Sequence, residues 1–193
     1  MSATTYQIQI SLNRLKPKIW RRVLVSPDML LPDFHRVIQT TMGWTNSHLH
    51  HFIKGHTFYT LKMQDDDFWD TMDNVEYSKM KISDLLKKEK EKILYEYDFG
   101  DSWEHTILLE KILQSDPSEQ LPVCLAGKNN GPPEDCGGVW GYANMIEILS
   151  NPKHEEYEQY MEWLEEEFDP SQFDKDAINA LLHTKDYGCL GFF

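Results

Sequence analysis

The chain has 193 residues, enough for one domain with a well-covered core, and its six Trp, nine Tyr and nine Phe predict a packed fold rather than disorder. Its formal net charge of −13, with 3 basic and 14 acidic side chains in residues 129–193, opposes general nucleic-acid binding, which depends on Lys and Arg neutralising phosphates. No segment approaches the roughly 18 apolar residues that cross a bilayer and no signal-peptide pattern opens the chain, so we expect a cytoplasmic protein without a membrane segment.

The first part of the chain predicts strands around one early helix. Apolar residues alternate along 5–13, and a second strand is expected at 18–26. A helix should follow with Pro32 in its first turn, Gly43 as its stop and an apolar stripe made of Leu31, Phe34, Ile38 and Met42. We then expect a short hairpin of strands 48–53 and 57–62 and an acidic loop at 65–74.

The second part predicts two more strands and then helices. The strands are expected at 92–98 and 103–113, after a brief turn at Ile82–Leu86. Residues 114–139 are rich in Pro, Gly and Asn and should be mostly loop, with one strand at 121–126. Helical patterns follow at 140–150, at 154–168 with a core-facing aromatic stripe, and after a cap at Asp174.

Strands gathered early and helices gathered late predict an α+β fold. We expect an antiparallel-rich mixed sheet with the early helix packed on it and a C-terminal helical segment. The organisation is interpreted as a single domain over 1–193, sheet-rich in 1–128 and made of loop and helices in 129–193.

The turn between the two central strands carries the most informative polar string, residues 97–105. Folding could bring Asp98, Asp101 and His105 to one rim, as a hard-metal or hydrolytic site requires. The structural alternative is that both aspartates bond backbone amides of the turn, Gly100 supplies a positive φ and Trp103 packs in the core.

A second candidate segment is the Pro- and Gly-rich loop at 132–138, which carries Glu134 and Asp135. These carboxylates could face those of the first turn, or could cap the helix that follows. His48 and His50, two apart on a predicted strand, would share a face and could bind a metal, although a polar strand edge has the same pattern. His35 lies on the helical apolar stripe and is interpreted as a hydrogen-bonded interior histidine.

One basic cluster keeps a nucleic-acid hypothesis open despite the acidic balance. Its members fall within nine residues and are Arg14, Lys16, Lys18, Arg21 and Arg22. A DNA-associated accessory protein would use such a cluster.

Several strings together resemble the plasmid open-reading-frame-three-like family, first described on an Ri plasmid. They are PKIWRRVLV at 17–25, LPDFHRVIQ at 31–39, MGW at 42–44, HLHHF at 48–52, YDFGDSWEH at 97–105 and PPEDCGG at 132–138. The resemblance spans roughly residues 5–180 and implies no established activity. Some members bear labels that link them to mobile elements, such as transposon-associated resolvase, but the chain shows no recombinase constellation.

These observations favour a soluble intracellular binding or interaction module with a polar cleft, because no complete catalytic constellation is present. The alternative is a metal-dependent hydrolase built on the candidate polar site, which comprises Asp98, Asp101, His105, Glu134 and Asp135. No cofactor is identified, and a divalent metal is the one that this site, with His48 and His50, would take. The charge balance favours a protein partner over nucleic acid.

Overall fold

The structure, a computed structural model, describes residues 4–62, 73–164 and 168–189. Its centre is one sheet in the order β5-β4-β3-β6-β7-β1-β2-β8, in which every neighbouring pair is antiparallel except β4 and β5. The strands are β1 (Thr4–Leu12), β2 (Trp20–Val25), β3 (His50–Lys54), β4 (Thr57–Thr60), β5 (Asn74–Glu76), β6 (Lys92–Tyr97), β7 (Trp103–Gln114) and β8 (Val123–Lys128).

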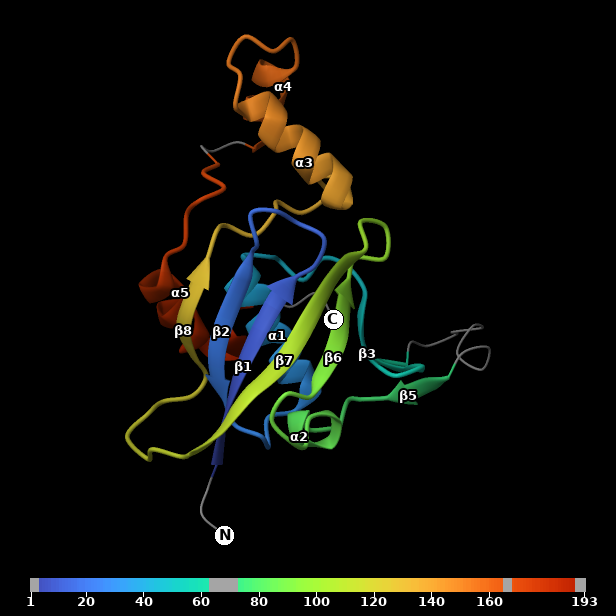
Figure 1. The fold of residues 1–193 in the computed structure, drawn as a ribbon, viewed down its shortest axis with the longest axis vertical. Helices are drawn as coiled ribbons and strands as arrows, with labels where there is room; N and C mark the ends of the chain where they lie inside the picture. The colour runs from blue at the N-terminus through green and yellow to red at the C-terminus, as the bar shows by residue number, and fades with distance from the viewer. Residues whose placement is uncertain (1–3, 63–72, 165–167, 190–193) are drawn as a thin grey trace.

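The helices confirm the predicted α+β class. They are α1 (Leu31–Met42), α2 (Ile82–Leu85), α3 (Gly138–Leu149), α4 (Tyr157–Leu164), α5 (Lys175–Leu182) and the 3₁₀ helix η2 (Lys185–Gly188). Figure 1 shows α1 behind the sheet, whereas α3 and α4 stand beyond one end of it. No helix in the described ranges is long and apolar enough to span a bilayer.

Helix α1 forms where its sequence pattern predicts. Its expected apolar stripe, Leu31, Phe34, Ile38 and Met42, is buried against the sheet. Gly43 ends the helix in the left-handed conformation with φ 86°, and its amide donates to the carbonyls of Gln39 and Thr40. The glycine stop is therefore confirmed, because a residue without Cβ takes this conformation without strain.

The long strands of the sheet have one buried and one partly exposed face. Along β7, alternate residues from Trp103 to Leu109 are buried, as the period of two in a strand requires. The opposite face carries polar side chains, among them Arg22, which forms a two-point ion pair with Glu110. The core thus lies between the sheet and α1, and the other face meets solvent.

Some elements differ from the sequence-based prediction. Strand β8 begins two residues later than expected, and the short elements β5 and η2 were not predicted. Helix α4 buries none of its residues, so its aromatic stripe only partly covers the core. Residues 65–72 of the predicted acidic loop lie outside the described residues.

Polar side chains are hydrogen-bonded inside the core between α1 and the sheet. His35 bonds the Tyr95 hydroxyl through Nδ1 at 2.8 Å and Asn46 Oδ1 through Nε2 at 2.7 Å, which confirms it as a satisfied interior histidine. Its ring stacks on that of His50, with centroids 3.5 Å apart and planes 3° apart. Burial lowers the pKa of His35 to about 4 and that of His50 well below its usual value, so both rings are neutral at pH 7.

These histidines predict acid sensitivity of the fold. A group whose folded-state pKa is depressed contributes stability above its unfolded pKa near 6.5 and loses it as pH falls towards the folded value, about 4 for His35. Each such histidine should lower the free energy of unfolding by up to about 1.4 kcal/mol per pH unit in that window. Urea unfolding at pH 7, 6 and 5 measures this slope.

The matched variants are His35→Gln and His56→Gln, the second in the exposed turn between β3 and β4. His35→Gln should be less stable at pH 7 but should show a shallower dependence on pH than the wild type. His56→Gln controls for the exchange of histidine for glutamine and should have the stability of the wild type at pH 7. Equal slopes for wild type and His35→Gln would contradict the assignment.

Candidate functional site

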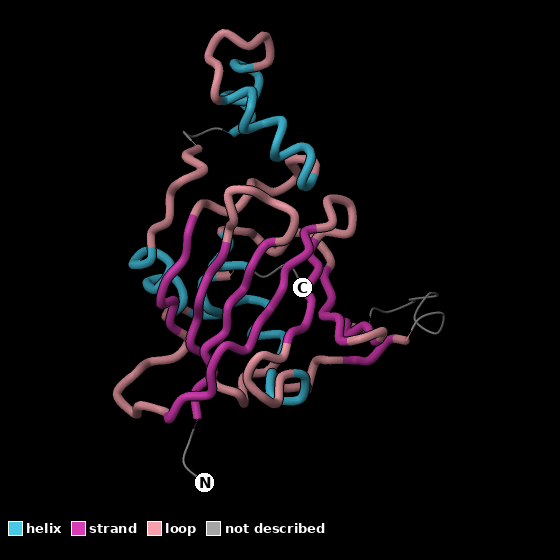
Figure 2. Tube along the Cα trace, viewed as in Figure 1, coloured by secondary structure: helices cyan, strands magenta, loops and turns pink. Residues whose placement is uncertain are grey.

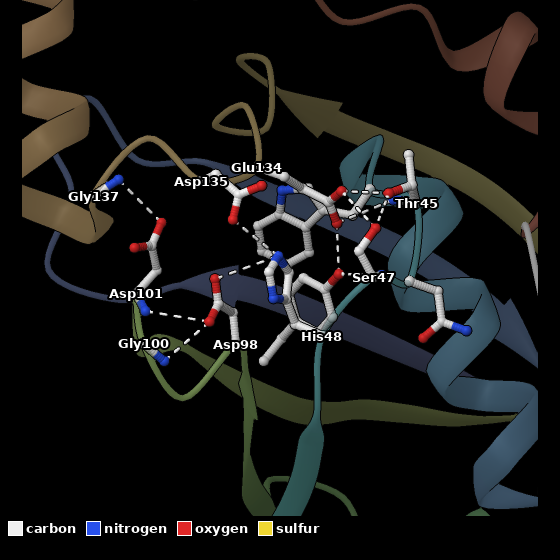
Figure 3. Close-up of polar contacts among 12 residues, drawn as sticks. Thr45, Ser47, His48, Asp98, Gly100, Asp101, Glu134, Asp135 and Gly137 are labelled. Atoms are coloured by element: carbon white, nitrogen blue, oxygen red, sulfur yellow. Dashed lines mark hydrogen bonds and ion pairs between the residues drawn. The ribbon is translucent and has the colours of Figure 1, made fainter. Parts of the chain in front are cut away.

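Three segments that are distant in sequence meet at the end of the sheet nearest α3. They are the connection from α1 to β3, the turn between β6 and β7, and the loop that leads from β8 into α3; Figure 2 shows these loops gathered at that end. Figure 3 shows that side chains from all three point towards one another. The fold thereby joins the two polar segments, 97–105 and 132–138, that the sequence singled out.

The turn between β6 and β7 is held by the carboxylate of Asp98. Its Oδ1 accepts hydrogen bonds from the amides of Gly100 at 2.9 Å and Asp101 at 3.4 Å, and Trp103 is buried. The expected positive φ of Gly100 was wrong: Asp98 at 58° and Ser102 at 53° adopt the left-handed conformation instead. Aspartate tolerates this region because its short side chain can bond nearby backbone amides, as it does here.

The second oxygen of Asp98 faces a histidine. His48 Nε2 lies 3.7 Å from Asp98 Oδ2 and 3.1 Å from Asp135 Oδ1, and the potential ligand atoms of the three side chains all lie within 4.8 Å of one another. Neither contact has hydrogen-bond geometry, so Nε2 is a buried nitrogen without a directed partner. The side chain of Asp98 is 11% exposed and that of Asp135 is 69% exposed, so the cluster opens to solvent on one side.

Glu134 turns away from this cluster and binds the connection between α1 and β3. Its carboxylate accepts from the Thr45 amide at 3.1 Å, the Tyr97 hydroxyl at 2.5 Å, the Thr45 hydroxyl and, at 3.4 Å, the Ser47 hydroxyl. Burial and the Glu134 carboxylate raise the pKa of Tyr97, which therefore remains a donor. Glu134 thus fixes the segment that carries His48.

Asp101 connects the turn to α3. Its Oδ2 accepts from the Gly137 amide at 3.1 Å, at the N-terminal end of that helix. The same turn also lines a cleft of about 880 Å³, whose walls come from the β1–β2 loop, the β6–β7 turn and the start of α3. The cluster and the cleft therefore share the β6–β7 turn.

His105 and His50 do not join the cluster, which corrects the expected grouping. His105 is fully buried because it alternates with Trp103 on the core face of β7, and its Nδ1 bonds the Trp103 carbonyl. His50 lies on β3, bonds the Tyr77 hydroxyl and stacks on His35 inside the core. His48 lies before β3 begins, so the two-residue strand period does not align it with His50.

The basic cluster of the β1–β2 region does not form one surface. Arg21 is 2% exposed, and its guanidinium donates to the carbonyls of Thr41, Trp20 and Lys128. Arg22 is paired with Glu110 on the open face of the sheet. Of the five residues in this cluster, Arg14, Lys16 and Lys18 are exposed. Fewer cations are therefore available to DNA than the DNA-associated hypothesis requires.

The site contains residues that sequence reasoning missed. Thr45 and Ser47, which bond Glu134, lie in an irregular connection without a recognisable motif. His48 was paired with the wrong partner because its true neighbours, Asp98 and Asp135, lie 50 and 87 positions later. The metal hypothesis had joined His48 and His50 to the two acidic segments, and the fold brings only His48 to them.

Comparisons with known proteins identify the family. The chain matches the model of the Plasmid pRiA4b ORF-3-like protein family over residues 4–177, and it belongs to this family. It is 33% identical over 179 residues to Uncharacterized protein y4hQ of Sinorhizobium fredii (strain NBRC 101917 / NGR234), covering 93% of this chain and 88% of the relative. A crystal structure of MM3350, a protein of unknown function from Methanosarcina mazei Go1, matches with a TM-score of 0.81 and 36% identity, over 92% of this chain and 98% of the other.

The four contacts of Glu134 predict a large effect of its removal. Glu134→Ala should lower the free energy of unfolding by about 1–3 kcal/mol, because it removes charge-assisted bonds and leaves the part-buried Tyr97 hydroxyl without its partner. Tyr97→Phe, which removes one of these bonds, should have an effect of about 1 kcal/mol. Chemical denaturation measures both, with Glu119→Ala in the exposed β7–β8 loop as the control, and equal stability of Glu134→Ala and that control would contradict the role.

Proposed function

We propose that this member of the family is a binding module whose polar cleft is organised around a divalent cation held by His48, Asp98 and Asp135. The observation that supports the proposal is the convergence of one imidazole nitrogen and two carboxylates, with His48 Nε2 buried and without a directed hydrogen bond. Such a nitrogen is costly unless it is paired, and a metal ion would pair it.

The donor set favours a particular class of ion. Imidazole suits Zn²⁺ and other transition metals, and carboxylates also suit Mn²⁺, so Zn²⁺ and Mn²⁺ are the two ions to test. Bonds of about 2.1 Å would place tetrahedral ligand atoms roughly 3.4 Å apart, closer than the 4.8 Å limit within which they now lie. Asp135, the most exposed of the three, has the freedom to close this difference.

Three protein ligands leave coordination positions for a ligand from solution. The exposed side of the cluster is formed by Asp135, and the adjoining cleft is reached across the β6–β7 turn. A metal with an open position can bind an oxygen atom of a small molecule directly. The proposed role is therefore ligand capture by an ion and a cleft together.

Isothermal titration of chelator-treated protein with Zn²⁺ and with Mn²⁺ tests the site. We expect one ion per chain, with binding at least tenfold weaker in His48→Ala and Asp98→Asn. The asparagine retains the Oδ1 acceptor for the amides of Gly100 and Asp101 and removes only the charge, so the turn should persist.

Asp116→Asn, in the exposed β7–β8 loop, is the matched control and should bind as the wild type does. Thermal unfolding of each variant without the ion checks that the fold is retained. A saturating concentration of the ion should raise the unfolding midpoint of the proteins that bind it, the wild type and Asp116→Asn. Failure of both ions to bind, or unchanged binding by His48→Ala and Asp98→Asn, would overturn the proposal.

A metal-dependent hydrolase is the second candidate, and the open side of the cluster favours it. A metal with three protein ligands and one water is the arrangement of many hydrolytic sites. However, His105 is buried on the core face and Glu134 is engaged by Thr45, Ser47 and Tyr97, so neither is placed as a free acid or base.

Assays with bis(p-nitrophenyl) phosphate and p-nitrophenyl acetate, at saturating Zn²⁺ or Mn²⁺, distinguish the two candidates. For a binding module we expect rates equal to those of Asp98→Asn measured alongside. Metal-dependent turnover by the wild type that Asp98→Asn lacks would instead establish the hydrolase.

A further inference from the structure

The cleft beside the cluster has the size and composition of a ligand site. Its volume of about 880 Å³ falls within the range of roughly 300–1,000 Å³ in which small-molecule sites occur. The lining comes from three separate segments and includes Arg14, Lys16, Asp101, Ser102 and Trp140. Cations, hydroxyl and backbone groups, and one large aromatic ring are therefore combined in one concave surface.

Trp140 is the most unusual feature of the cleft. It lies in the first turn of α3 and is 86% exposed, the highest value among the large hydrophobic side chains that are exposed in the described ranges. An indole left in water at the wall of a cleft offers a flat face on which an aromatic ring can stack. By contrast, Trp44 and Trp103 are buried in the core.

The opposite wall supplies positive charge in a protein of net charge −13. Lys16 is exposed and forms no ion pair within the described part of the chain. Arg14, also exposed, contacts Glu104 through one nitrogen at 2.8 Å, which leaves other donors of its guanidinium for a ligand. This charge favours an anionic ligand.

The carboxylate in the cleft is already engaged. Asp101 Oδ2 accepts from the Gly137 amide, so its charge lies against the N-terminal end of α3. The Asp101 carboxylate therefore occupies the N-terminal end of α3, and an anionic group of the ligand would bind at Arg14 and Lys16 instead. Gly138 brings this wall close to the turn, because a Cβ at that position would meet the Asp101 carbonyl oxygen at 2.5 Å.

We propose that the cleft binds a phosphorylated ligand with a flat aromatic ring, of the nucleotide class, with the ring on Trp140 and phosphate at Lys16 and Arg14. The inference deepens the proposed function and rests on it, because a divalent ion held by carboxylates commonly completes its coordination with ligand phosphates. The β6–β7 turn borders both places, because Asp98 belongs to the ion cluster and Asp101 lines the cleft.

Isothermal titration with ADP up to about 1 mM, in the presence of Mn²⁺, tests this inference. We expect measurable binding by the wild type, and at least tenfold weaker binding of adenosine, which lacks the phosphates, and of pyrophosphate, which lacks the ring. ADP should also quench part of the tryptophan fluorescence of the wild type, and this quenching should be absent in Trp140→Phe.

Two matched pairs of variants locate the site. Trp140→Ala should weaken ADP binding roughly tenfold, whereas Trp163→Ala, which removes an exposed tryptophan from α4, should not. Lys16→Ala should also weaken binding, whereas Lys18→Ala, an exposed lysine outside the cleft lining, should not. Trp140 and Lys16 are exposed, so these variants should fold as the wild type does.

Absence of ADP binding, or equal effects within each pair, would overturn the inference. Titration of the ion without ADP is a separate measurement. An ion that binds while ADP does not would reject the nucleotide assignment and leave the proposed function intact. Failure of the ion to bind would reject the proposed function itself. If ADP nevertheless binds without an ion, and this binding still requires Trp140 and Lys16, the cleft is retained as a nucleotide site and the ion is rejected.

Discussion

The site depends on the attachment of the loop after β8 to the connection that follows α1. Gly131 lies so close to α1 that a Cβ at this position would stand 1.9 Å from the Met42 carbonyl oxygen. The Trp44 indole then donates to the Pro132 carbonyl at 2.8 Å, and Glu134 accepts from Thr45 and Tyr97. These contacts set where Asp135 and the start of α3 lie, so both the ion cluster and the cleft follow from them.

The two oxygens of the Asp98 carboxylate in the β6–β7 turn have different surroundings. One oxygen of Asp98 holds the turn by accepting from two amides, and the other faces His48. Asp101 likewise bonds Gly137 while it lines the cleft. The structural interpretation of this motif is thus supported for Asp98 and Trp103, but not for Asp101, which accepts from an amide at the start of α3, nor for the φ of Gly100. It does not compete with the proposed site, because the bonded oxygens orient the free ones.

Sequence periodicity predicted most of the fold because it reports local geometry. The buried stripe of α1 and the cap at Asp174, which accepts from the amides of Asp176 and Ala177, follow from residues a few positions apart. The parallel pairing of β4 with β5 and the grouping of His48 with Asp135 depend on contacts between distant segments. The burial of His105 could have been predicted from the strand period, since Trp103 on the core face requires His105, two residues later, to face the core too.

The charges around the cluster support the proposed cation site. Asp98 and Asp135 bring two carboxylates to one nitrogen, and no Lys or Arg of the described residues forms an ion pair with either. The histidines of the nearby core cannot supply the missing charge, because burial lowers their pKa values and keeps them neutral. Two neighbouring carboxylates repel each other, although only Asp98 is shielded from water, and a divalent ion in the proposed site would relieve that repulsion. In the proposed site, the repulsion that destabilises the two carboxylates would be the source of the affinity for the ion, an exchange of stability for binding seen at many functional sites.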